Sequence, residues 1–169
     1  MSVGTAVAEK TITLGLGQLK AAKGDDVVLA CLGLGSCVAI CAWDPGSRVG
    51  GMAHMVLPSS GDARNPSAGY KFVDKAIPAL LDDMIKLGAQ RSRLVVKLVG
   101  GAQVVAVSAS TDLFNIGQRN ADASRKLLQS LGLNVKASDV GGNRGRTARL
   151  YLDSGKLLVS KVGERPVEL

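Results

Sequence analysis

The sequence predicts an α+β fold, a layered mixed-sheet sandwich with two main helices. Three observations lead to it. Short strand-like segments punctuated by glycine are frequent, only two segments place apolar residues at helical spacing, and strands do not alternate regularly with helices. The 169 residues contain no segment with the composition of a linker. We therefore expect a single domain over residues 1–169.

Strand-like segments dominate the first third of the chain. Residues 11–18 alternate weakly, residues 27–35 are apolar before they thin into glycines, and residues 38–43 and 49–57 flank the turn signal Asp44-Pro45-Gly46-Ser47. Proline presets φ and glycine supplies a positive φ in such a turn. If the turn is centred between Pro45 and Gly46, paired residue numbers sum to 91. The hairpin then places Cys37 directly opposite His54, on the same face of the sheet.

The rest of the chain supplies the helices and the remaining strands. A polar loop over residues 59–67 precedes an amphipathic helix over residues 67–87, which ends at Gly88 and should kink or start late at Pro78. A second helix should begin near Asn115, with Gln118 completing a capping box, and stop at Gly132. We expect strands over residues 94–99 and 133–140, and a terminal hairpin of residues 147–153 and 156–162. Residues 104–114 fit no element clearly.

Composition narrows the functional class. No segment approaches the length of an apolar membrane span, and the N-terminus lacks the pattern of a signal peptide, so we expect a cytoplasmic protein without membrane insertion. Three cysteines in that compartment should stay reduced. The net charge of +7 comes from scattered basic residues, and one Trp, two Tyr and two Phe are too few for base stacking. We therefore expect no nucleic-acid partner.

The expected pairing of Cys37 with His54, the only histidine, suggests a thiol hydrolase. An imidazole can take the thiol proton, and the resulting thiolate attacks a carbonyl carbon. Gly33 and Gly35 precede the cysteine and allow a tight turn that brings backbone N–H groups to the developing oxyanion, to which Ser36 could add its hydroxyl. The alternative is structural, because cysteines are often buried as small hydrophobic residues; that is our default for Cys31 and Cys41.

Other sites are less well supported. Cys31, Cys37, Cys41 and His54 lack the closely spaced cysteine pair of structural zinc sites, and Cys37 and Cys41 on one strand would lie about 13 Å apart. We expect neither a metal nor a cofactor. Asn143, Arg144 and Arg146, in a flexible basic turn, are candidates for holding a substrate carbonyl or an acidic partner, with a plain turn as the alternative.

Five blocks, in order along nearly the whole chain, resemble the CheD family of bacterial chemotaxis proteins: residues 33–38 (GLGSCV), 52–58 (MAHMVLP), 98–102 (LVGGA), 115–120 (NIGQRN) and 139–143 (DVGGN). The resemblance implies deamidation of glutamine side chains on methyl-accepting chemotaxis receptors, a fold similar to that of the cytotoxic necrotizing factor toxins, and binding to a CheC-type phosphatase. It also implies that Cys37 is the nucleophile and His54 the general base. The family's third catalytic residue is a threonine at the position where this chain has Cys31.

Three alternatives remain open from the sequence. Hydrolysis of glutamyl methyl esters is chemically adjacent to deamidation. A non-catalytic adaptor that binds CheC or receptors is kept open by Cys31, because a thiol is a weaker hydrogen-bond partner than a hydroxyl. A cysteine protease would use the same pair of side chains but would release fragments.

Overall fold

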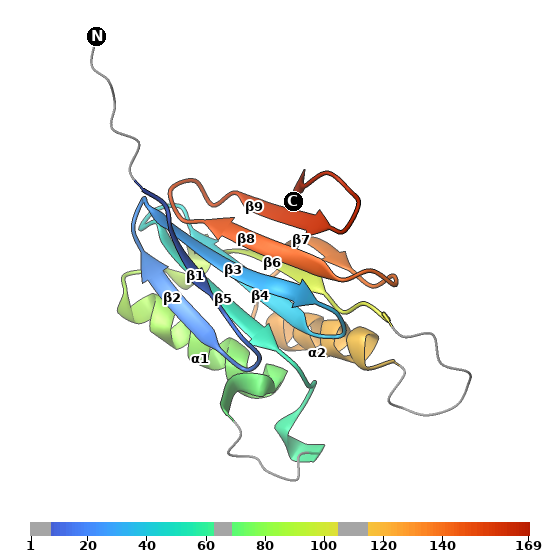
Figure 1. Cartoon of the computed structure of the whole chain (residues 1–169). Coiled ribbons are helices and arrows are strands. Elements are labelled where there is room, and N and C mark those ends of the chain that lie inside the picture. Colours follow the sequence, from blue (N-terminus) through green and yellow to red (C-terminus); the bar gives the residue numbers. More distant parts are fainter. Residues whose placement is uncertain (1–7, 63–68, 105–114) are drawn as a thin grey trace.

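Two five-stranded sheets face each other in the computed structural model, which describes residues 8–62, 69–104 and 115–169. One sheet has the order β1-β3-β8-β9-β10 and the other β2-β5-β4-β6-β7 (Figure 1). The elements are β1 (Lys10–Thr13), β2 (Leu19–Lys23), β3 (Val27–Leu34), β4 (Val38–Asp44), β5 (Val49–Met55), α1 (Val73–Lys86), β6 (Val95–Gly100), α2 (Ile116–Ser130), β7 (Val135–Val140), β8 (Arg146–Tyr151), β9 (Leu157–Lys161) and β10 (Val167–Glu168), with short 3-10 helices at Ser60–Asp62, Gly69–Lys71 and Arg91–Arg93.

The central strands have apolar residues on both faces because each face packs against a different layer. On β4, Ile40 packs toward the two helices, whereas Ala39 and Cys41 pack toward the other sheet. Helices α1 and α2 both cover the outer face of the β2-β5-β4-β6-β7 sheet (Figure 1). The protein is therefore a sheet–sheet–helix sandwich with two main helices, and the predicted α+β class is confirmed.

Both sheets are mixed. Strand β1 runs parallel to β3, β6 runs parallel to β7, and the other pairs are antiparallel. The parallel β6–β7 pair is joined through α2, as a parallel connection requires a crossover. This connection places the first turns of α2 beside the ends of β4 and β6. No helix within the described ranges is long and apolar enough to cross a bilayer.

Several local expectations were wrong. A single strand over residues 11–18 is instead β1, a turn in which Gly17 has φ 72°, and the unpredicted β2. The first helix starts only at Val73, and it continues through Pro78. The capping box does not form, because Asn115 makes no side-chain cap and Gln118 donates to Asp122 instead, at 2.8 Å. Residues 105–114, and residues 63–67 of the predicted polar loop, lie outside the described ranges.

Candidate active site

Cys37 and His54 lie at the same end of the β4–β5 hairpin, opposite to its turn. The register pairs Ala39 with His54, so paired numbers sum to 93 and the predicted direct opposition to Cys37 was wrong by two residues. The loop is wider than expected, because Asp44 pairs with Val49 and Arg48 adopts φ 56°. Because side chains alternate between the two faces of a strand, a register shift of two residues leaves each side chain on its predicted face. Cys37, one residue before β4, is thus a diagonal neighbour of His54 on the face toward the other sheet, with Cβ atoms roughly 7–8 Å apart or less.

The imidazole of His54 is held in one orientation. Its Nδ1 lies 3.0 Å from the carbonyl oxygen of Leu14, and the side chain is only 4% exposed. A carbonyl can only accept, so Nδ1 carries the proton of the neutral ring and Nε2 keeps a lone pair. No described residue bonds Nε2. The backbone is also fixed, since His54 N donates to Gln18 O and Gly17 N donates to His54 O, both at 2.9 Å. This is the tautomer that a general base requires.

Cys37 is half-buried and packs against the apolar core between the sheets. Burial raises the pKa of its thiol, an effect that a hydrogen bond from its own backbone N–H partly opposes. The resting thiol is therefore neutral near pH 7, and no hydrogen bond joins it to His54 Nε2. Catalytic hydrogen bonds are often long in unliganded proteins and tighten around substrate.

The carbonyl groups around Cys37 all have donors. Ala102 N donates to Gly35 O at 2.8 Å, the Asn120 side chain donates to Ser36 O at 3.0 Å, and Gly101 N donates to Cys37 O at 2.8 Å. In a trans peptide the N–H points away from the preceding carbonyl, and the described chain contains no cis bond. The amides of Ser36 and Cys37 therefore point away from these partners.

Glycines let the backbone approach Cys37 closely. Gly100 has φ 117°, and a Cβ there would overlap the carbonyl oxygen of Cys37. Gly101 has φ 63°, and its Cβ would lie 2.7 Å from the carbonyl oxygen of Gly117 at the start of α2. Both positions thus require glycine for conformation and for space. The Gly100-Gly101 pair therefore supports the candidate nucleophile.

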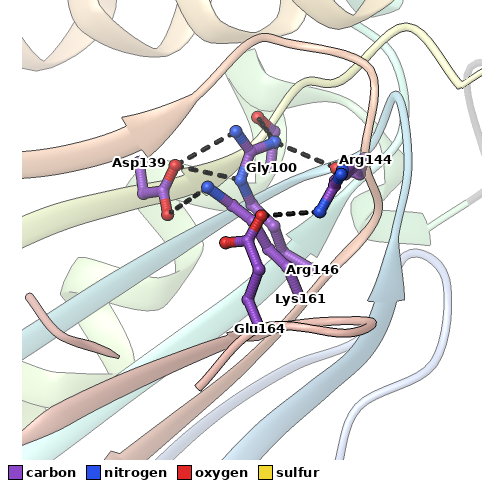
Figure 2. A network of polar contacts seen from close by, with 6 residues as sticks. All are labelled: Gly100, Asp139, Arg144, Arg146, Lys161 and Glu164. Carbon is purple, nitrogen blue, oxygen red and sulfur yellow. Dashed lines mark hydrogen bonds and ion pairs between the residues drawn. The ribbon is translucent and has the colours of Figure 1, made fainter. Parts of the chain in front are cut away.

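An ion-pair network holds Gly100 from the other side (Figure 2). Arg146 is only 5% exposed, and its Nε and Nη2 each lie 3.0 Å from Asp139 Oδ1, while Nη1 donates to Gly100 O at 3.4 Å. Lys161 Nζ lies 3.3 Å from the other oxygen of Asp139. A buried guanidinium is stable only when paired in this way. The network therefore fixes the segment against which the Cys37 carbonyl rests.

The other two cysteines are fully buried between the sheets. Burial, with a smaller contribution from nearby Cys37, raises the pKa of Cys31 to about 12, and burial raises that of Cys41 well above its usual range. At the position of the family's threonine, Cys31 is not the partner of His54 Nδ1, which bonds Leu14 O instead. Within residues 8–62, 69–104 and 115–169, no group of three or more His, Cys, Asp or Glu side chains could hold a metal ion.

Asn143 and Arg144 are exposed, in the turn before β8. Arg144 Nη1 lies 2.6 Å from Glu164 Oε1, so its charge is already paired (Figure 2). Arg144 also lines an open cavity of about 480 Å³, together with Gly33, Gly145, Arg146, Thr147, Ser160, Lys161 and Val162. Gly33 belongs to the segment that leads to Cys37. Neither Cys37 nor His54 lines this cavity, to which three basic side chains contribute.

Sequence reasoning missed three supports of the site: the Leu14 carbonyl, Asn120, and the Asp139–Arg146 pair. The Leu14 carbonyl has no signal in the sequence, since every residue has one. Asn120 does have a signal, because it lies on the buried stripe of α2, which consists of Gly117, Asn120, Ala121, Ser124 and Leu128. A buried asparagine among small and apolar residues requires partners.

The family model and the relatives that match this chain point to the same family. Residues 56–161 match the family model described as CheD chemotactic sensory transduction. A protein of Thermotoga maritima named chemoreceptor glutamine deamidase CheD is 41% identical over 150 residues, 89% of this chain and 91% of its own. Two proteins named probable chemoreceptor glutamine deamidase CheD are similar. That of Caldanaerobacter subterraneus is 40% identical over 91% of this chain and 94% of its own, and that of Symbiobacterium thermophilum is 42% identical over 92% and 95%.

One solved structure, a Neisseria meningitidis protein of the family DUF152, covers 74% of this chain and 52% of its own at a TM-score of 0.40 and 13% identity, a likeness too distant to add to the argument. The family model covers more than half of the chain, and the relatives align over about nine tenths of it. The chain belongs to the CheD family of chemotaxis proteins.

Proposed function

We propose that this protein hydrolyses glutamine side-chain amides to glutamates on methyl-accepting chemotaxis receptors, with Cys37 as nucleophile and His54 as general base. The observation that carries the proposal is the state of His54. The Leu14 carbonyl occupies Nδ1 and leaves Nε2 as a free base, on the face of the sheet that Cys37 shares. Relatives about 40% identical are named for this activity.

The first half of the reaction forms a thioester. The Cys37 thiol gives its proton to His54 Nε2, and the sulfur attacks the amide carbon of glutamine. The amide oxygen becomes an oxyanion, which the N–H groups of Ser36 and Cys37 stabilise. When the C–N bond breaks, imidazolium returns the proton to the leaving nitrogen, and ammonia departs.

The second half consumes water. His54 Nε2 takes a proton from a water molecule that attacks the thioester carbon, and the C–S bond breaks. The sulfur recovers the proton, and glutamate leaves with a carboxyl group in place of the amide. The raised pKa of Cys37 suits this sequence, because the thiolate then forms together with proton transfer rather than persisting in the resting protein.

The same proposal includes partners and location. A CheC-type phosphatase is the proposed regulatory partner, and Asn143 and Arg144, beside the open cavity, are proposed to contact a receptor or that partner. Three free cysteines fit a reducing compartment, so we propose that the protein acts in the cytoplasm. Glutamyl methyl esters present a similar carbonyl and are a second substrate class for the same chemistry.

The test is incubation with a receptor cytoplasmic fragment, followed by mass spectrometry of its peptides. We expect specific glutamines to gain the small mass increase that exchange of NH2 for OH brings, with release of an equal amount of ammonia. Cys37→Ala should abolish both signals, whereas Cys41→Ala, which removes a thiol buried deeper in the same core, should retain them.

Other outcomes identify the alternatives. A wild-type protein that binds the fragment but leaves every glutamine intact is an adaptor, and the proposal is then wrong. Cleaved fragments in the same spectra would identify a protease. A methylated receptor fragment, assayed in parallel for methanol release, measures the esterase activity.

A further inference from the structure

Asn120 joins the two segments that carry the candidate catalytic pair. Its side-chain Nδ2 donates to Ser36 O at 3.0 Å and to Val56 O at 2.9 Å. Ser36 directly precedes Cys37, and Val56 lies two residues after His54. One fully buried amide group on α2 thus bridges the nucleophile loop and the end of β5.

The amide group suits this bridge. An asparagine NH2 has two donors in one plane and can serve two carbonyls at once, which a single hydroxyl on serine or threonine cannot do. Both carbonyls need a donor, because a buried carbonyl without a hydrogen bond destabilises the folded protein. The base of the side chain is itself fixed. Gly117, one turn earlier on the same helix, packs against the Gly101 backbone.

The other end of the same side chain has no partner. Asn120 Oδ1 is buried and accepts no hydrogen bond from the described residues. A side chain selected for stability alone would not leave a buried acceptor unpaired. The geometry that Nδ2 imposes on Ser36 and Val56 is therefore the feature that explains an asparagine here.

We propose that Asn120 is a positioning residue of the deamidase, an inference that rests on the function proposed above. By holding the Ser36 carbonyl, it orients the Ser36–Cys37 peptide and directs the Cys37 N–H toward the oxyanion. By holding Val56 as well, it fixes the distance between the Cys37 loop and the strand of His54. Asn120 itself touches neither substrate nor the reacting atoms.

The experiment compares Asn120→Ala and Asn120→Ser with the control Ser124→Ala, which removes another buried polar group from the same helix face. For each variant, kcat and KM are measured on the receptor fragment, thermal unfolding is recorded, and Cys37 alkylation by iodoacetamide is timed at alkaline pH. We expect kcat of both Asn120 variants to fall by about 10²-fold, the loss typical of one oxyanion donor, with KM within about threefold. Alkylation should stay within about threefold of wild type, because alkylation develops no oxyanion. Ser124→Ala should keep its kcat within about threefold.

Three outcomes would overturn the inference. Folded Asn120 variants with wild-type kcat would show that the bridge does not act on the reaction. Failure of both variants to fold, with Ser124→Ala folded, would make Asn120 a structural residue. A wild-type protein that modifies no glutamine would remove the proposed function, and this role with it; active wild type with active variants rejects the Asn120 role alone.

Discussion

The two ends of the β4–β5 hairpin both carry buried polar side chains but differ in how these polar groups are hydrogen-bonded. At the turn, the fully buried carboxylate of Asp44 accepts from Gly46 N and Gln90 N at 2.8 Å, from Ser47 Oγ at 3.0 Å, and from Arg93 through two bonds of 2.8 Å. At the opposite end, His54 Nε2 and Asn120 Oδ1 are buried and have no hydrogen-bond partner among the residues that the structure describes.

This difference in hydrogen bonding distinguishes a structural anchor, at the turn, from the candidate active site at the opposite end. A buried polar atom without a partner costs about 1–3 kcal/mol, and the turn shows that this fold can provide five bonds to a single carboxylate. Departures from full satisfaction concentrate where function requires them. The turn therefore stabilises the hairpin, whereas at the open end, opposite the turn, no described residue bonds the Nε2 lone pair of His54. Substitutions at the turn should lower stability and leave activity unchanged. Substitutions at the open end should lower activity and leave stability nearly unchanged.

The largest effect is expected at the open end, from His54→Asn. We expect kcat to fall by about 10³-fold or more, because His54 is the only histidine of the chain and the proposed acceptor of the Cys37 proton. The free energy of unfolding should change by less than about 1 kcal/mol, since the asparagine amide nitrogen lies near the position of Nδ1 and can donate to Leu14 O, and Nε2 contributes no hydrogen bond to be lost. Deamidation rates and urea unfolding measure the two quantities. A variant with wild-type turnover would show that the unpartnered imidazole is not the base.

At the turn, Asp44→Asn should have the reverse effect. An amide NH2 would face groups that themselves donate, so we expect a loss of about 2–4 kcal/mol in the free energy of unfolding. Activity per folded molecule should be unchanged. The matched control is Asp25→Asn, because Asp25 pairs with Arg48 at 2.9 Å on the exposed surface and should contribute less than about 1 kcal/mol. Equal losses of unfolding free energy in the two variants would contradict the role of Asp44 as a structural anchor.

The contribution of Asp44 should also depend on pH. Hydrogen bonds from Arg93, and then from the Gln90 and Gly46 N–H groups, hold the pKa of this carboxyl well below its usual range against the opposing effect of burial. A group with a depressed folded pKa stabilises above its unfolded pKa, about 3.9, and loses that stabilisation as the pH falls through the folded value. The difference in unfolding free energy between wild type and Asp44→Asn should be constant from about pH 5 to 7 and shrink below about pH 4. Urea unfolding across this range tests it, and a constant difference down to pH 2 would contradict it.

The sequence predicted the helices and strands better than it predicted their register and their contacts with one another. The turn signal between the strand-like residues 38–43 and 49–57 was enough to place Cys37 and His54 on one face, because a side-chain period of two survives a shift of two. The exact register was not predictable, since the wide loop depends on Arg48 at a positive φ, which is uncommon outside glycine. The carbonyl that orients His54 comes from a residue 40 positions away and depends on tertiary structure alone. Pairing of β3 with β8, across more than a hundred residues, is equally invisible to local patterns.

The smallest effect is expected from Cys31, and it tests which group orients the base. Because the Leu14 carbonyl already holds His54 Nδ1 at 3.0 Å, Cys31→Ala and Cys31→Thr should both keep kcat within about threefold of wild type. Loss of the group that orients a catalytic histidine costs on the order of 10⁴-fold in rate, so the two possibilities are well separated. Steady-state deamidation by both variants, normalised to the folded fraction, measures the effect. A large loss in Cys31→Ala would make the thiol part of the catalytic machinery, whereas a large gain in Cys31→Thr would show that the Leu14 carbonyl alone holds the ring imperfectly.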